Sequence, residues 1–157
     1  MKAKKKQIQL RAHHLLCLQG YQGYGYDENF KKNMENILKN SDNLDVFLTY
    51  DIDEICNYCP NLKKNKCVLN LDSHKNYESN NTNINEKIDE SNNTIIQMDL
   101  NVLKKMKINK NEKNSYKLKT LFEKTEKSFK SVSDLSLMCK GCRWEDVCLF
   151  YQSKKKN

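Results

Sequence analysis

Cysteine placement constrains this chain more than any other feature of its sequence, because most of the seven cysteines lie in two short windows. A Cys-x2-Cys pair opens each window, and such a pair lets two thiolates on one tight turn reach the same metal ion or cluster. We therefore expect the two windows to meet around a metal centre, with metal binding coupled to folding. The expected ligands are Cys56, Cys59, Cys67, Cys139, Cys142 and Cys148.

Two kinds of metal centre are compatible with these spacings. Structural zinc takes four ligands, so the two Cys-x2-Cys pairs could hold one ion, but Cys67 and Cys148 would then be unexplained. Iron–sulfur clusters also take four thiolates, and the Cys59-Pro60 pair is similar to ferredoxin runs. Either each group needs a fourth ligand and forms its own site, or both converge on one cluster with spare thiols nearby. Buried free thiols alone do not explain the clustering.

Three further candidates lie near the N-terminus, in the segment His13-His14-Leu15-Leu16-Cys17. Adjacent histidines on a helix point about 100° apart, so both do not easily bind one ion. One of them could be a ligand or a proton carrier, or both could be structural residues at the edge of the core. Cys17 could supply a fourth ligand, although its apolar neighbours favour a buried thiol.

Apolar periodicity predicts a mainly α fold, a small single domain with one short strand or hairpin near 44–50. Asp27 is expected to cap the helix at 28–39, and Ser133 or Asp134 a last helical stretch before the second cysteine window. The N-terminal segment 8–19 is expected to begin extended and then become helical. The other expected helical segments are 99–107 and 115–129.

Composition divides the chain into a core and accessory segments. Hydrophobic residues make up 38% of the chain, so the core should be small. Residues 1–7 and 153–157 are expected to be basic tails on a single domain at 8–152. The Asn-rich stretch at 72–94 is expected to be a mobile surface insertion, because its composition cannot bury enough apolar surface.

Charge and hydropathy limit the partners. The net charge is +8, with many lysines in the tails, which could contact nucleic acid weakly and non-specifically. Only Arg11 and Arg143 could read guanine in the bidentate way, so sequence-specific DNA binding is disfavoured. No apolar run approaches the roughly 20 residues of a membrane span, and the basic start lacks an uninterrupted apolar signal core. We expect a cytoplasmic protein without membrane association.

Two aromatic or glycine-rich features have alternative explanations. Gly20, Gly23 and Gly25 do not follow the order of a dinucleotide fingerprint. Their segment is expected to be a structural turn, or else a substrate loop beside a cluster. Trp144 is expected to anchor the core through the last helix. The alternative is that its indole shields a cluster from water.

Several motifs together are similar to one protein family. They are L-R-x-H-H-L-L-C at 10–17, G-x-G-Y at 23–26, F-x-x-N-M at 30–34, I-C-x-x-C-P at 55–60 with Cys67, and C-x-G-C-x-W-x-x-x-C at 139–148. In this combination the chain resembles a family of small prokaryotic proteins of unknown function that are described as probable iron–sulfur binding proteins. The resemblance implies a cluster-binding protein, but no substrate and no reaction. The Asn-rich stretch departs from the compact form of that family.

The resulting hypothesis is an iron–sulfur protein engaged in electron transfer or redox chemistry with a redox protein partner. An open iron acting as a Lewis acid, with His13 or His14 as acid–base partner, would instead make an enzyme. The alternative from another class is a zinc-stabilised module that binds nucleic acid or protein. The sequence does not distinguish an electron carrier from an enzyme and assigns no catalytic residue.

Overall fold

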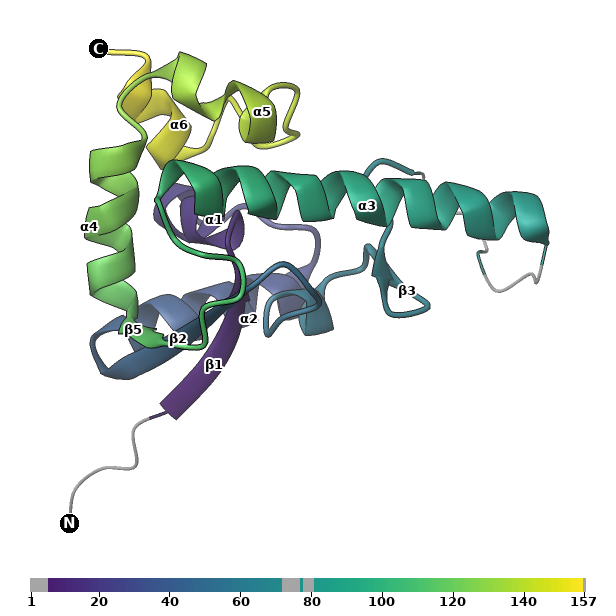
Figure 1. The fold of residues 1–157 in the computed structure, drawn as a ribbon, viewed down its shortest axis with the longest axis horizontal. Helices are drawn as coiled ribbons and strands as arrows, with labels where there is room; N and C mark the ends of the chain where they lie inside the picture. The colour runs from purple at the N-terminus through teal and green to yellow at the C-terminus, as the bar shows by residue number, and fades with distance from the viewer. Residues whose placement is uncertain (1–5, 72–76, 78–80, 157) are drawn as a thin grey trace.

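The computed structural model describes residues 6–71, 77 and 81–156, and it is mainly α-helical, as predicted (Figure 1). Short 3-10 turns occur at Ser41–Asn43, Cys56–Tyr58 and Val132–Leu135. The α-helices are α1 (His14–Gly20), α2 (Glu28–Lys39), α3 (Thr82–Lys105), α4 (Leu118–Ser128), α5 (Ser136–Cys139) and α6 (Leu149–Lys154). The strands are β1 (Lys6–Arg11), β2 (Leu44–Thr49), β3 (Leu62–Lys63), β4 (Lys66–Cys67) and β5 (Ser115–Lys117).

The β structure is larger than the single strand or hairpin that the sequence predicts. Strands β1 and β2 are parallel, with Ile8 opposite Val46, and β5 is antiparallel to β2. Alternate residues of β1 such as Ile8 and Leu10 are buried, which is the period-2 pattern of a strand with one face on the core. Strands β3 and β4 form a separate antiparallel hairpin.

Helix α2 confirms the prediction for residues 28–39. Phe30, Met34 and Ile37 are buried on one face, as their helical spacing requires. The side chain of Asp27 accepts a hydrogen bond from the backbone N–H of Phe30 at 2.8 Å, which satisfies one of the free donors at the helix start.

Residues 82–94, which the sequence predicts to be part of a mobile surface insertion, form the first half of helix α3. Ile88, Ser91, Ile95 and Asp99 follow each other at spacings of three or four residues and are all buried on one face. These few positions give the helix a buried stripe although the segment as a whole is polar. Residues 72–76 and 78–80 lie outside the described part of the chain.

Both predicted tails are shorter than expected, and one cap is placed differently. Lys6 belongs to β1, and Lys154 belongs to α6, where its side chain is buried and its ammonium group pairs with Glu126. Ser131, rather than Ser133 or Asp134, is the N-cap before the second cysteine window, and Asp134 completes its capping box. Residues 1–5 and 157 lie outside the described part of the chain.

The main hydrophobic core joins the sheet to the helices. It includes Leu10 of β1, Leu15 of α1, Leu44 of β2, Leu118 of α4 and Phe129, all of which are buried. Helix α3 runs across the molecule, with the sheet on one side and α5 and α6 on the other, while α4 stands at its end (Figure 1). No helix in the described ranges is long and apolar enough to cross a membrane.

Candidate metal centre

All seven cysteines line one cavity of about 150 Å³. They come from three segments that are far apart in the sequence, namely α1, the region of the β3–β4 hairpin and the C-terminal segment around α5 and α6. The expected meeting of the two cysteine windows is therefore the arrangement that the structure has. The cavity also contains both candidate histidines of the N-terminal segment, His13 and His14.

Cys17 joins the C-terminal group of cysteines. Burial raises the pKa of its thiol well above the usual value, and Cys142, Cys139 and Cys148 raise it further, which places these thiols near one another. The flanking leucines are buried in the core, whereas the thiol of Cys17 lies on the wall of the cavity. Cys17, predicted to be either a buried thiol or a fourth ligand, thus lies beside three other cysteines.

Gly20 explains how α1 and the C-terminal segment come so close. It follows Cys17 by three residues on the same helix face, and a Cβ atom placed on it would lie 2.0 Å from the Sγ of Cys148. No side chain other than hydrogen fits between the helix and this sulfur. The end of α1 therefore admits Cys148 to the set that contains Cys17.

The C-terminal Cys-x2-Cys pair forms the tight turn that its spacing predicts. The N–H of Cys142 donates to the carbonyl oxygen of Cys139 at 2.9 Å, and Gly141 between them has a φ of 76° that favours glycine. The N–H of Trp144 in turn donates to the Sγ of Cys142 at 3.5 Å. Such a donor stabilises a thiolate.

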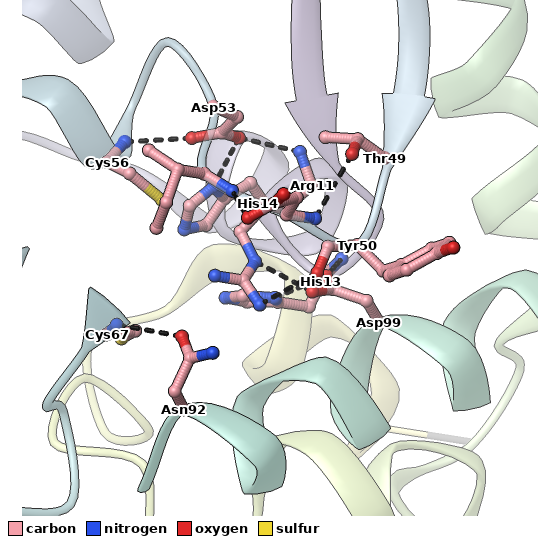
Figure 2. Close-up of polar contacts among 12 residues, drawn as sticks. Arg11, His13, His14, Thr49, Tyr50, Asp53, Cys56, Cys67, Asn92 and Asp99 are labelled. Atoms are coloured by element: carbon pink, nitrogen blue, oxygen red, sulfur yellow. Dashed lines mark hydrogen bonds and ion pairs between the residues drawn. The ribbon is translucent and has the colours of Figure 1, made fainter. Parts of the chain in front are cut away.

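The first cysteine window is built on a 3-10 turn followed by a hairpin. The N–H of Cys59 donates to the carbonyl oxygen of Cys56 at 2.9 Å, and the hairpin places Cys67 of β4 opposite Leu62 of β3. The N–H of Cys67 donates to Oδ1 of Asn92 at 2.9 Å, and this bond ties the hairpin to α3 (Figure 2).

Each candidate histidine is held by its own buried aspartate (Figure 2). His13 Nδ1 lies 2.7 Å from Oδ1 of Asp99, and His14 Nδ1 lies 2.7 Å from Oδ2 of Asp53. Burial tends to raise the pKa of both aspartates, but the histidines and further hydrogen bonds hold it below the usual range. The carboxylates are thus ionised acceptors, so each Nδ1 donates and each Nε2 remains available.

Arg11 places a buried positive charge beside the first cysteine window. Its side chain is 1% exposed, its Nε donates to Oδ2 of Asp99 at 2.7 Å, and a terminal nitrogen donates to the carbonyl oxygen of Tyr50 at 3.3 Å. Burial tends to lower the pKa of Arg11, whereas Asp99 and Cys56 raise it. Arg11 is therefore part of the site, and not a surface residue for a nucleic-acid partner.

The thiols favour their neutral form in the absence of a cation. Burial raises the pKa of Cys59 to about 11 and, together with Cys142 and Cys148, the pKa of Cys139 to about 12. Burial also raises the pKa of Cys56, Cys67 and Cys142. Several thiols crowded into one cavity repel one another as thiolates, and a bound cation would remove that repulsion. The donor set therefore fits a metal centre.

Aromatic side chains from the glycine-rich loop and from the C-terminal segment form one wall of the cavity. The ring of Trp144 lies edge-on to Tyr26 at 5.5 Å between centroids, and the guanidinium of Arg143 lies 5.0 Å from the indole centroid. Trp144 is only half-buried. It is therefore a cavity wall rather than the core anchor that the sequence favours.

Residues 25–148 match a family model described as Protein of unknown function (DUF1284). The chain belongs to this family. Neither the curated proteins nor the solved structures provide a match to it. Both cysteine windows of this DUF1284 protein lie within the matched residues, whereas His13, His14 and Cys17 precede them.

Sequence reasoning missed the two aspartates of the DUF1284 site. Asp99 interrupts the apolar stripe of α3 with a charge, and a charge at a core position is a signal for a buried partner. Asp53 precedes Cys56 by three residues and accepts its N–H at 2.8 Å, a spacing typical of a capping aspartate. Nothing in the local sequence indicates that these carboxylates reach His13 and His14.

Proposed function

We propose that this DUF1284 protein binds an iron–sulfur cluster through Cys17, Cys139, Cys142 and Cys148 and uses it in electron transfer or redox chemistry. The observation that carries the proposal is the convergence of seven thiols from three distant segments on one cavity. Four thiolates are the usual ligand set of such clusters. When bound, the cluster would supply one-electron chemistry.

The size of the cavity supports a cluster over a single zinc ion. A structural zinc ion binds four ligands at about 2.0–2.3 Å and needs little space beyond that shell. The seven thiols instead line a space of about 150 Å³, which suits a polynuclear centre.

The protein supplies the surroundings that govern such a centre. The N–H of Trp144 donates to Cys142, and hydrogen bonds of this kind to cluster sulfurs raise the reduction potential. The wall of Tyr26 and Trp144 limits the access of water from one side. Both features are properties of an electron-transfer site.

The test is purification without oxygen, followed by a visible absorption spectrum and by measurement of iron, acid-labile sulfide and zinc. We expect a coloured protein with iron and sulfide in equal amounts. Changing Cys17→Ser or Cys142→Ser should remove the cluster of this set. A colourless protein with stoichiometric zinc would contradict the proposal and favour the zinc-stabilised module.

A further inference from the structure

We infer that the same cavity holds a second iron–sulfur cluster, with Cys56, Cys59, Cys67 and His14 as its ligands. This inference rests on the proposed function, because it assigns the thiols that the first cluster does not use. The seven cysteines and His14 then make two complete sets of four ligands.

The thiols sort into two sets by their neighbours. Cys17 is influenced by the three cysteines of the C-terminal segment, whereas Cys59 is influenced by Cys67 of the hairpin. Tyr26 also lines the cavity, where the charges of Cys59, Cys17 and Cys142 act on its hydroxyl. The hairpin that carries Cys67 and the turn that carries Cys139 and Cys142 are separate local structures, which favours two neighbouring centres over one shared centre.

The hairpin places backbone N–H groups beside its thiols, as the C-terminal turn does. The N–H of Asn61 hydrogen-bonds to the thiol of Cys59, and the N–H of Leu69 to that of Cys67. In each case the donor lies two residues after the cysteine, as Trp144 does for Cys142. A donor in this position stabilises the thiolate form of the cysteine, which is the form that ligates a metal.

His14 supplies the fourth ligand, and Asp53 orients it. Ligand atoms of His14, Asp53 and Cys56 all lie within 4.8 Å of one another. The carboxylate of Asp53, however, is already saturated: Oδ1 accepts from the N–H groups of Ile55 and Cys56 at 2.9 and 2.8 Å, and Oδ2 accepts from the N–H of Arg11 at 2.6 Å and from His14 Nδ1. His14 Nε2 is therefore the ring nitrogen left for ligation, with Asp53 fixing the ring near Cys56 (Figure 2).

Two further groups favour a negatively charged, sulfur-rich occupant at this end of the cavity. Asn61 is 5% exposed and lines the cavity, and its side chain tends to lower the pKa of the Cys59 thiol. A buried amide donor beside this sulfur favours the thiolate form, which is the form that ligates a cluster. The guanidinium of Arg11 interacts with the thiol of Cys56 and would offset the charge of a thiolate-bound cluster.

The experiment compares metal content and paramagnetic resonance of variants purified without oxygen. Wild-type protein should contain about twice the iron and sulfide of either Cys67→Ser or Cys142→Ser, and the double variant should contain neither. His14→Ala should lose half of the iron, and His14→Cys should restore it. Circular dichroism of each variant is the control that checks whether the fold is retained.

Histidine ligation has its own readout. In protein with ¹⁵N-labelled histidine, the reduced cluster should show a hyperfine coupling to ¹⁵N that His14→Cys removes. The variant His74→Ala, at the third histidine of the sequence, is the control and should keep the coupling.

Different outcomes overturn different statements. If Cys67→Ser and His14→Ala keep all the iron while Cys142→Ser loses it, the second cluster is wrong and the first cluster stands. Zinc instead of iron in the hairpin set also overturns the inference. Wild-type protein without iron would overturn both proposals.

Discussion

Single atoms decide how closely the segments of the site approach. Gly20 has room for no side chain, because a Cβ atom there would lie 2.0 Å from the sulfur of Cys148. Asp53 and Asp99 each determine which nitrogen of a histidine faces the cavity. The chemistry of the cavity thus depends on residues that are not themselves ligands.

Changing Gly20→Ala should lower the cluster content of the C-terminal set more than that of the hairpin set. The added methyl group occupies the position that Cys148 needs, whereas none of the three atoms nearest to it belongs to Cys67. Iron content in the Cys67→Ser background, with and without Gly20→Ala, measures this. Gly23→Ala meets no atom within 4 Å but has a φ of 98°, so it strains the loop without touching a thiol and serves as the control. Equal iron losses in both variants would contradict the steric explanation.

Changing Asp99→Ala should destabilise the protein by about 3–5 kcal/mol, because it leaves the buried charge of Arg11 without its partner. Urea unfolding of the metal-free protein measures the change. The matched control is Asp42→Ala, which removes an exposed partner of Lys119 and should cost about 0–1 kcal/mol. Similar losses in the two variants would show that the Arg11 pair is not a buried one in solution.

At the scale of elements, helix α3 departs most from what the sequence predicts. Its first half is polar, yet Ile88 and Ile95 are buried on the face that carries Asp99. The hairpin is tied to this half by Asn92, so α3 positions both the first cysteine window and the aspartate of His13. A segment that looks like a surface insertion is therefore a support of the site.

Changing Ile88→Ala should destabilise the protein by about 2–5 kcal/mol, since a fully buried isoleucine is truncated. Ile96→Ala, the same substitution at a partly exposed position of α3, should cost less. Urea unfolding gives both values, and amide exchange should show protection at 84–95 that Ile88→Ala weakens. Rapid exchange of 84–95 in the wild type would contradict an ordered helix there.

Much of the fold could be predicted from local pattern, and the failures share one cause. Helix α2 and its Asp27 cap follow from periodicity and capping chemistry within one segment. The pairing of β1 with β2 and the ordering of residues 82–94 depend on contacts with distant residues, which local composition does not reveal. The spacing of the cysteines pointed to the residues that share the cavity, and their role as ligands stays a prediction. The aspartates that orient the histidines depend on long-range contacts.

At the scale of the whole molecule, the cavity couples the protonation of its thiols to stability and, under the proposed function, to metal binding. The thiols of Cys59 and Cys139 have pKa values raised by burial to about 11 and 12, compared with about 8.5 for a thiol in an unfolded chain. The folded protein without metal therefore holds protons that the unfolded chain releases. Because metal ligation requires thiolates, binding of a metal would release those protons.

The free energy of unfolding of the metal-free, reduced protein should fall as the pH rises from about 8.5 towards 11. Over this range the unfolded chain loses thiol protons that the folded protein keeps, so each raised pKa favours unfolding. Urea unfolding at several pH values measures this contribution. The fall in the free energy of unfolding with pH should be smaller in a Cys59→Ser, Cys139→Ser double variant. An unchanged dependence of this free energy on pH would show that these thiols are not buried in solution.

The origin of the cavity thiols in three distant segments also determines when they can come together. Roughly 130 residues separate Cys17 from Cys148, which at about 5–20 residues per second is on the order of ten seconds of translation. During that interval Cys17 has been synthesised but Cys148 has not. Under the proposed function, the cluster that Cys17 and Cys148 share can therefore be completed only after the C-terminal segment has been synthesised.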